Sequence, residues 1–318
     1  MATLEVSSEK TPLAGKRGTR SSIIEDETSV TDVVLAAMEG AENPRLREVM
    51  AALTRHLHAF AREVRLTEEE FDFGIDFLNR IGQATNDTHN EGILFSDVLG
   101  FSTLVCLLNN GTAGATETAS ALLGPFWRMN SPRTENGGSI LRSETPGPAL
   151  FVNARIVDPQ GRGLAGVEVD VWQASPVGLY ENQDDTQADM NLRGKFTTDA
   201  EGWFRFRSIR PAGYPVPTGG PAGDLLRAQR RHPFRPAHLH FLAFREGYKT
   251  LITQVFVDDD DHLETDVVFG ATRHLIGDFR RNEAGSPPSP DITGPWYTLD
   301  YTFVMEPGEA RLPKPPIK

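Results

Sequence analysis

The sequence predicts an α+β protein in which an N-terminal helical part precedes an antiparallel β-sandwich. Two observations predict this class. Residues 28–110 repeat apolar side chains at steps of three and four, whereas residues beyond about 149 alternate apolar and polar side chains in short runs. No helix of any length is expected between those runs, and this favours an antiparallel sandwich or barrel over a parallel α/β sheet.

The helical part, residues 28–110, contains the clearest periodic pattern in the chain. Pro44 stands at a favoured first-turn position, and Thr67 with Glu70 predicts a capping box at the start of the next helix. Residues 93–110 predict one further helix. The helix that begins at Pro44 carries a single apolar stripe: Leu46, Val49, Met50, Leu53, Leu57, Phe60 and Val64.

Residues 111–318 are expected to form the sandwich. Residues 111–148 are rich in turn residues and predict a linker that leads into it. Residues 1–27 are polar and predict a flexible arm, with ordering on a partner subunit as the alternative. Six short alternating runs predict the strands: residues 150–158, 167–174, 202–209, 237–244, 251–258 and 297–305.

Composition restricts the class of partners. The chain has 318 residues, of which 44 are acidic and 32 basic, and its net charge of -12 disfavours binding to nucleic acid. No apolar run approaches the ~20 residues of a membrane span, and no signal-peptide core is expected.

The single cysteine, Cys106, excludes an intrachain disulfide and predicts a buried thiol in a reducing cytoplasm. The acidic run 258–261 predicts a solvated strand end, with a cation site as the alternative.

The stretch RPAHLHF, residues 235–241, places two histidines on one predicted strand. His238 and His240 are two residues apart, so their side chains point to one side with Cα atoms roughly 6–7 Å apart. This spacing suits two ligands of one metal, and the alternative is a pair of hydrogen-bonded imidazoles. Glu246 lies about 20 Å further along the strand, too far for direct coordination. Carboxylates on other strands stay open as further ligands.

Two of the five tyrosines stand on loops at the ends of predicted strands. Tyr180 follows the run VDVWQA, and Tyr214 lies in the segment AGYPVP. Two imidazoles and two phenolates would suit ferric iron better than zinc, whose usual ligands are cysteine, histidine and carboxylate. A strongly polarising cation would be needed to ionise phenols whose pKa is normally about 10. The alternative is two surface aromatics with one hydrogen bond each.

These four residues and the segment RPAHLHF resemble the intradiol ring-cleaving dioxygenases, non-haem Fe(III) enzymes that open 1,2-dihydroxybenzenes between the two hydroxyls. The resemblance extends over almost the whole chain, through GPFW, GLYENQD, MNLRGKF, GYPVPTGGP and TQVFVDDDD. It implies a catalytic sandwich in residues 111–318 with one Fe(III) per subunit. It also implies a homodimer formed through the helices of residues 28–110, where an amphipathic phospholipid can occupy a tunnel at the interface.

The resemblance also implies roles for individual residues. Substrate would release Tyr214, which then acts as a general base. Arg235 would stabilise negative charge that develops on the ring, and Gln254 would polarise the same region. The alternatives are a surface salt bridge for Arg235 and an outward-facing strand residue for Gln254. The implied iron ligands are Tyr180, Tyr214, His238 and His240.

Within the family, the stretch ILFSDVLGFS resembles the branch that acts on hydroxyquinol (1,2,4-trihydroxybenzene). In that branch an aspartate three residues after a leucine lines the pocket, and the matching positions are Leu94 and Asp97. A third hydroxyl needs an acceptor, whereas a buried carboxylate would be costly beside an unsubstituted ring. The alternative for Asp97 is a carboxylate at a helix N-terminus. Further implied wall residues are Gly124, Pro125, Phe126, Val216, Pro217 and Val268.

The expected activity is therefore Fe(III)-dependent cleavage of hydroxyquinol by O2 to 3-hydroxy-cis,cis-muconate and maleylacetate. The first alternative is the same chemistry on catechol or a substituted catechol, which gives cis,cis-muconates. The second alternative belongs to another class, a metal-free β-sandwich that binds carbohydrate or protein.

Overall fold

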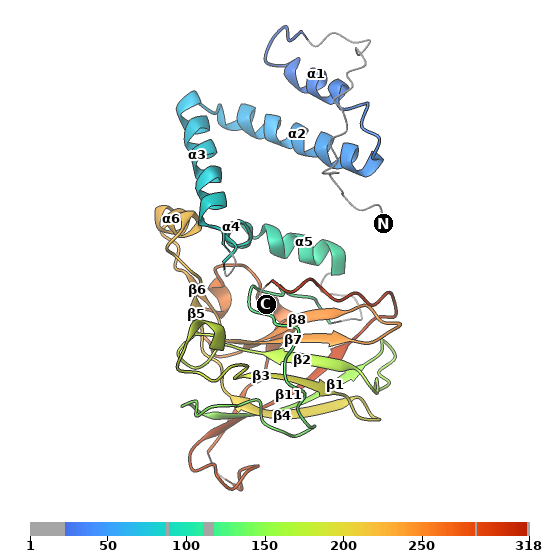
Figure 1. Cartoon of the computed structure of the whole chain (residues 1–318), viewed down its shortest axis with the longest axis vertical. Coiled ribbons are helices and arrows are strands. Elements are labelled where there is room, and N and C mark those ends of the chain that lie inside the picture. The colour runs from blue at the N-terminus through green and yellow to red at the C-terminus, as the bar shows by residue number, and fades with distance from the viewer. Residues whose placement is uncertain (1–22, 87–88, 111–117, 284, 317–318) are drawn as a thin grey trace. The chain divides into compact units, whose positions relative to one another are not determined.

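The structure is a computed structural model that describes residues 23–86, 89–110, 118–283 and 285–316 (Figure 1). The chain divides into two compact units, Met1–Asp76 and Phe77–Lys318, with the division inside the third helix. Residues 1–22 of the expected arm and residues 111–117 of the expected linker lie outside the described residues.

The described part of the first unit is built from helices, and two of them, α2 and α3, begin where the sequence predicts. The Asn43 side chain accepts hydrogen bonds from the first turn of the helix that starts at Pro44. The Thr67 N–H donates to the Glu70 carboxylate at 2.9 Å and the Glu70 N–H donates to the Thr67 hydroxyl at 3.3 Å, which confirms the capping box. The helices are α1 (Val30–Ala37), α2 (Pro44–Val64) and α3 (Glu68–Ala84), whose later turns belong to the second unit.

The expectation of one helix over residues 93–110 is wrong, because the segment forms two helices, α4 (Glu91–Val98) and α5 (Phe101–Asn110), bent by 82°. The chain turns at Gly100, where φ is +70° and a Cβ would lie 3.1 Å from the Phe269 ring. Apolar residues continue through this turn, so periodicity alone does not reveal it.

No single helix among the described residues is long and apolar enough to cross a membrane, and only the bent pair α4 and α5 reaches those limits together. Cys106 on α5 is half-buried rather than buried as expected.

Two open sheets form the body of the second unit (Figure 1), which confirms the α+β class. One sheet has the strand order β10-β11-β1-β4, the other has the order β3-β2-β7-β8-β9, and β5 pairs with β6. The strands are β1 (Ala149–Val157), β2 (Glu168–Trp172), β3 (Arg193–Thr197), β4 (Trp203–Ile209), β5 (Tyr214–Pro215), β6 (Phe234–Arg235), β7 (His238–Phe244), β8 (Leu251–Val257), β9 (Ile276–Gly277), β10 (Arg280–Asn282) and β11 (Trp296–Val304).

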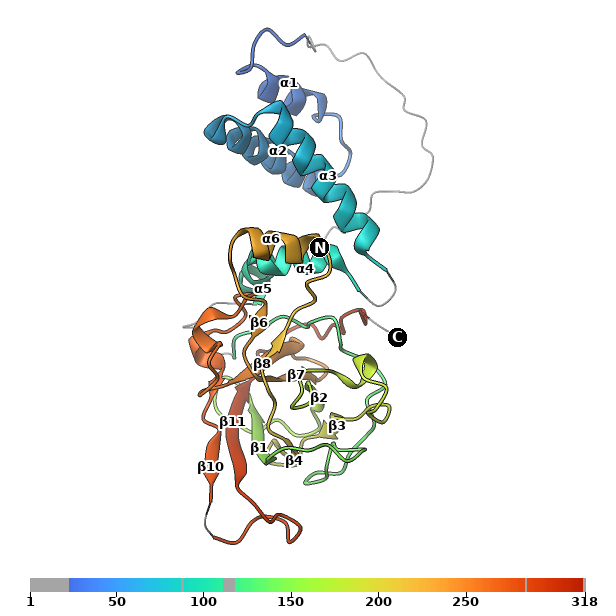
Figure 2. The same ribbon diagram turned by 90° about the vertical axis from the view of Figure 1, so that its left-hand side faces the viewer.

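Two details of the predicted sandwich are corrected. The sheets are mixed rather than wholly antiparallel, because β1 pairs with β11, and β8 with β9, in parallel. Alternation assigns residues to faces but leaves the direction of the neighbouring strand undefined. A helix also interrupts the strands: α6 (Pro221–Ala228) lies between β5 and β6 and packs against α4 (Figure 2).

The two faces of β7 belong to different environments, and this positions the site. Leu239, Phe241 and Ala243 point into the main core between the two sheets. His238 and His240 alternate with them and therefore point away from that core. Period-two alternation thus places both imidazoles on one face, as the sequence predicts.

Candidate metal centre and cavity

His238 and His240 are both buried, and their Nε2 atoms lie 3.1 Å apart. The Nδ1 atom of His238 lies 2.7 Å from the carbonyl oxygen of Pro236. A carbonyl only accepts, so Nδ1 carries the proton and Nε2 offers its lone pair.

Two tyrosines reach this pair from loops distant in sequence. Tyr180 stands just before the short 3-10 helix Glu181–Gln183, and Tyr214 opens β5. The Tyr180 hydroxyl lies 3.1 Å from the His240 Nε2 atom and 3.4 Å from the Tyr214 hydroxyl. Both phenols are buried, so the alternative of two surface aromatics is wrong.

The four side chains fit a single metal ion. Donor atoms about 2.1 Å from one ion, at right or tetrahedral angles, lie roughly 3.0–3.4 Å apart. The Tyr180 hydroxyl lies 3.4 Å from the Tyr214 hydroxyl and 3.1 Å from the His240 Nε2 atom, and the two imidazole Nε2 atoms lie 3.1 Å apart. These distances match that spacing. Within the described part of the chain, no three histidine, cysteine or carboxylate side chains form an alternative metal cluster. The sequence leaves open a carboxylate as a third ligand beside the two histidines, and no such carboxylate is found among the described residues.

Burial controls the protonation of these groups. It lowers the pKa of His238 to about 3, with a further contribution from Arg235, and it lowers the pKa of His240 well below the usual value. Both imidazoles are therefore neutral and able to bind a metal. Burial also raises the pKa of the Tyr180 phenol, with the neighbouring Tyr214 adding to the effect. Ionisation of that phenol thus requires a cation beside it.

Arg235 is buried beside this cluster, so the alternative of a surface salt bridge is wrong. Its guanidinium donates to both carboxylate oxygens of Asp266 at 3.3 Å and to the Gln254 side-chain oxygen at 2.9 Å. Gln254 is buried too and does not face outward. The guanidinium also lies 3.2 Å from the His238 Nε2 atom, and it must leave that lone pair if an ion binds there. Asp266 is a partner that the sequence analysis missed.

A cavity of about 410 Å³ adjoins this cluster, and Tyr214 and Arg235 form part of its wall. All eight residues expected on the substrate wall line it: Leu94, Asp97, Gly124, Pro125, Phe126, Val216, Pro217 and Val268. The remaining lining residues were not predicted from the sequence: His89, Asn90, Ile93, Leu122, Asn182 and Gln183. Asn182 and Gln183 follow Tyr180 directly in sequence, and that proximity is a signal that could have identified them.

Asp97 is the second-last residue of α4, so the alternative of a carboxylate at a helix N-terminus is wrong. Burial raises the pKa of Asp97 to about 6. Ser102 and the charge of Arg235 lower it, whereas the charge of Asp266 raises it. A carboxyl group in this setting is a strong hydrogen-bond acceptor inside a largely apolar cavity.

Comparison with known proteins agrees with this geometry. A family model described as "Dioxygenase" matches residues 122–307, and one described as "Catechol dioxygenase N terminus" matches residues 43–116. The chain belongs to the intradiol ring-cleavage dioxygenase family. Hydroxyquinol 1,2-dioxygenase of Rhizobium sp. (strain MTP-10005) is 42% identical over 86% of this chain and 93% of its own length. Catechol 1,2-dioxygenase of Candida albicans is 40% identical over 86% of this chain and 91% of its own length.

Solved structures of the family share the fold. The crystal structure of hydroxyquinol 1,2-dioxygenase from Pseudomonas putida DLL-E4 superposes with a TM-score of 0.82 and 37% identity. The superposition covers 89% of this chain and 99% of that one.

In this member of the family, a buried ion pair braces the loop that carries Tyr180. The Arg193 guanidinium donates to the Glu181 carboxylate at 2.7 Å and to the backbone oxygen of Phe126 at 2.6 Å. Arg193 and Glu181 are 0% and 1% exposed at their side chains. One arginine thus connects the residue after Tyr180 to a residue of the cavity wall.

The acidic run 258–261 is used within the fold. The Asp258 carboxylate accepts a hydrogen bond from the Phe279 N–H, and the Asp260 carboxylate accepts one from the Ala237 N–H, just before β7. These contacts favour the strand-end interpretation over a cation site.

Proposed function

We propose that this dioxygenase opens the ring of hydroxyquinol with O2 to give 3-hydroxy-cis,cis-muconate and its tautomer maleylacetate. The observation that carries the proposal is the position of Asp97 on the wall of the cavity that Tyr214 and Arg235 also line. The relatives named as hydroxyquinol dioxygenases support it. Overall identity does not separate the substrates, because the catechol enzyme of C. albicans is 40% identical.

We propose that one Fe(III) per subunit binds to Tyr180, Tyr214, His238 and His240. When bound, ferric iron would supply a Lewis acid to which the two adjacent hydroxyls of the diol can bind as a chelate, and this would activate the ring. The convergence of these side chains at one buried point argues against the alternative of a metal-free binding module.

The remaining groups have separable tasks. Tyr214 belongs to the donor cluster and also lines the cavity, so its phenolate can leave the cluster and accept a proton from the diol. Arg235, held by Asp266 and Gln254, presents a fixed positive charge to negative charge that develops on the ring. Apolar wall residues such as Phe126 and Val216 exclude water from the ring.

Asp97→Ala tests the choice of diol. We expect kcat/KM for hydroxyquinol to fall roughly 10- to 100-fold, because a hydrogen bond from the third hydroxyl to a charged acceptor is lost. Activity on catechol should stay the same, since catechol lacks that hydroxyl. Steady-state assays on both diols measure the change. Asp224→Ala is the matched control, because it removes an exposed carboxylate from α6 outside the cavity.

The pH dependence gives a second readout for Asp97. Its pKa of about 6 means that the carboxylate is protonated as the pH falls from neutral through that value. The preference for hydroxyquinol over catechol should therefore decrease in this range, and the decrease should vanish in Asp97→Ala. If both diols lose activity equally in Asp97→Ala, the substrate proposal fails and catechol becomes the better assignment.

We also propose a homodimer formed through the N-terminal helices, with a phospholipid at the interface. Its support is an apolar face of α2 that stays between 37% and 55% exposed: Met50, Leu53, Leu57, Phe60 and Val64. Spacings of three and four place these side chains on one side of the helix. An apolar face of this length favours burial against a second copy.

Light scattering tests the dimer. The unsubstituted protein should be a dimer at micromolar concentration, and Phe60→Glu should shift it to monomer because a charge would be buried at the interface. Arg55→Glu, on another side of α2, should leave the dimer intact. A monomeric unsubstituted protein would contradict the proposal.

We also propose that the protein works in a reducing cytoplasm and that its partners are the diol and O2. The single cysteine supports the location, and the net charge of -12 argues against nucleic acid as a partner.

A further inference from the structure

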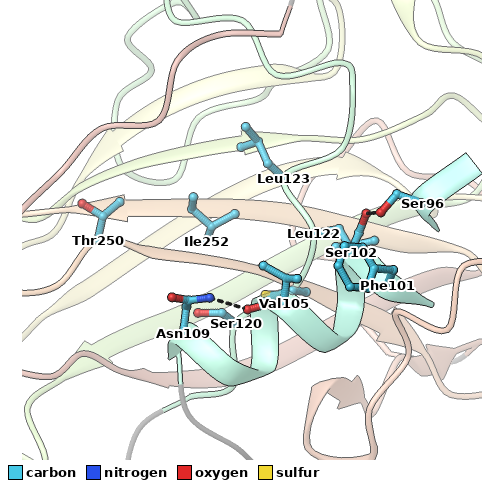
Figure 3. Close-up of a pocket in the computed structure, with 12 residues that line it drawn as sticks. Ser96, Phe101, Ser102, Val105, Asn109, Ser120, Leu122, Leu123, Thr250 and Ile252 are labelled. Carbon is cyan, nitrogen blue, oxygen red and sulfur yellow. Dashed lines mark hydrogen bonds between the residues drawn. The ribbon is translucent and has the colours of Figure 1, made fainter. Parts of the chain in front are cut away.

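A second cavity, of about 420 Å³, lies beside the first in the second unit, between α5, the segment 120–123 and β8 (Figure 3). On the α5 side, Phe101 and Val105 are 59% and 42% exposed, so the cavity adjoins the surface there. The described residues that line it are Ser96, Phe101, Ser102, Val105, Cys106, Asn109, Ser120, Ala121, Leu122, Leu123, Thr250 and Ile252.

The chemistry of this second cavity differs from that of the first. No acidic or basic side chain is among the described residues that line it. Several of its polar groups are satisfied within the protein: the Ser102 hydroxyl donates to the Ser96 hydroxyl at 2.8 Å, and the Asn109 amide donates to the Val105 carbonyl at 2.7 Å (Figure 3). Most of the remaining lining is apolar, and apolar cavities take up apolar molecules such as xenon. The second cavity therefore suits a small apolar molecule better than a diol.

Among the residues that the structure describes, Leu122 alone lines both cavities. Its backbone is fixed, because its carbonyl accepts a hydrogen bond from the Gln254 amide at 2.7 Å and the Ala121 N–H donates to the Ile252 carbonyl at 2.9 Å. The side chain of Leu122 is therefore the part of the partition that can change rotamer without breaking a backbone hydrogen bond.

The same partition borders the metal ligands. A Cβ at Gly124, two residues after Leu122, would lie 3.2 Å from the His240 ring, so the backbone there runs against a ligand. Gln254 is paired with His240 across β7 and β8. Leu122 and Leu123, which line the second cavity, are therefore followed directly in the chain by a residue that lies against a metal ligand.

The two substrates of the proposed reaction differ in the same way as the two cavities. A diol needs the polar groups of the first cavity, Asp97 and Arg235 among them, and it occupies that cavity when bound. O2 is small and apolar, and the proposed reaction needs it at the ring of the bound diol. A separate apolar route would let O2 reach the ring while the first cavity is occupied.

We propose that the second cavity is the entry route and reservoir for O2, with the Leu122 side chain as the gate into the reaction site. The inference rests on the proposed function only in its use of O2 as the second substrate, and it holds for any diol.

The first test uses xenon, an apolar atom that occupies dry cavities. Crystals of the iron-loaded protein under xenon pressure should show a xenon atom in the second cavity. Xenon confined to other sites, or density for a bound acyl chain in place of xenon, would overturn the inference because the route would then be closed.

The second test is kinetic. Val105→Phe places a ring in the second cavity, and it should raise the KM for O2 roughly tenfold while the KM for the diol and kcat at saturating O2 stay unchanged. Leu104→Phe is the matched control, since Leu104 is the neighbouring residue on α5, is 52% exposed and does not line the cavity. An unchanged KM for O2 in Val105→Phe, in protein that no longer binds xenon there, would overturn the inference. Loss of turnover on every diol in the unsubstituted protein would instead count against the proposed function.

Discussion

Tyr180→Phe is expected to weaken and shift the phenolate-to-iron absorption band of the iron-loaded protein, because only Tyr214 remains as a phenolate ligand, and to lower ring cleavage by on the order of 10³-fold or more. A catalytic metal lowers the activation barrier by several kcal/mol, and each 1.4 kcal/mol corresponds to a factor of ten in rate. The Tyr180 hydroxyl is within 3.4 Å of both the His240 Nε2 atom and the Tyr214 hydroxyl, so its loss removes one donor from the middle of the cluster. Phenylalanine keeps the ring and its stacking on Phe126.

The measurement combines iron content, the phenolate-to-iron absorption band and steady-state turnover. Tyr297→Phe is the matched control, because Tyr297 lies on β11, outside the donor cluster and the cavity. The control should keep its iron and colour. If Tyr180→Phe retains the iron and an unchanged band, the four-ligand assignment is wrong.

Arg193→Met is expected to lower the free energy of unfolding by about 3 kcal/mol, the lower end of the range for breaking a buried ion pair. The Glu181 carboxylate would lose its buried partner, and the Phe126 carbonyl would lose a donor. Arg128 also donates to Glu181, at 3.0 Å, and this contact limits the loss. For a chain of this size the melting temperature should fall by roughly 4–6 °C.

Thermal and urea unfolding measure this effect. Arg133→Met is the control, because Arg133 pairs with Glu168 at the surface, where the side chains are 68% and 38% exposed. An exposed pair contributes at most about 1 kcal/mol. Equal destabilisation by the two substitutions would contradict the role of burial. Because Glu181 follows Tyr180, Arg193→Met should also weaken iron binding, whereas Arg133→Met should not.

The sequence could predict the local features of the fold. Side chains at steps of three and four identify α2, the residues Thr67 and Glu70 identify the start of α3, and period-two alternation identifies the main strands. These features depend on neighbours within a few positions, so the local sequence pattern predicts them. The local pattern does not predict the break at Gly100 or the parallel partners of β1 and β8, because these depend on contacts with distant segments.

For the site, the sequence by itself determined that His238 and His240 share one face of a strand, because that follows from strand geometry. The family resemblance added Tyr180, Tyr214 and the wall residues. Only the tertiary structure decided that Tyr180, 60 residues away, lies 3.1 Å from His240. It also decided that Asp266 holds Arg235 and that Arg193 braces the loop after Tyr180. These contacts join residues that are distant in sequence, and they form only when the sheets pack and bring their loops together. The local sequence pattern therefore does not predict them.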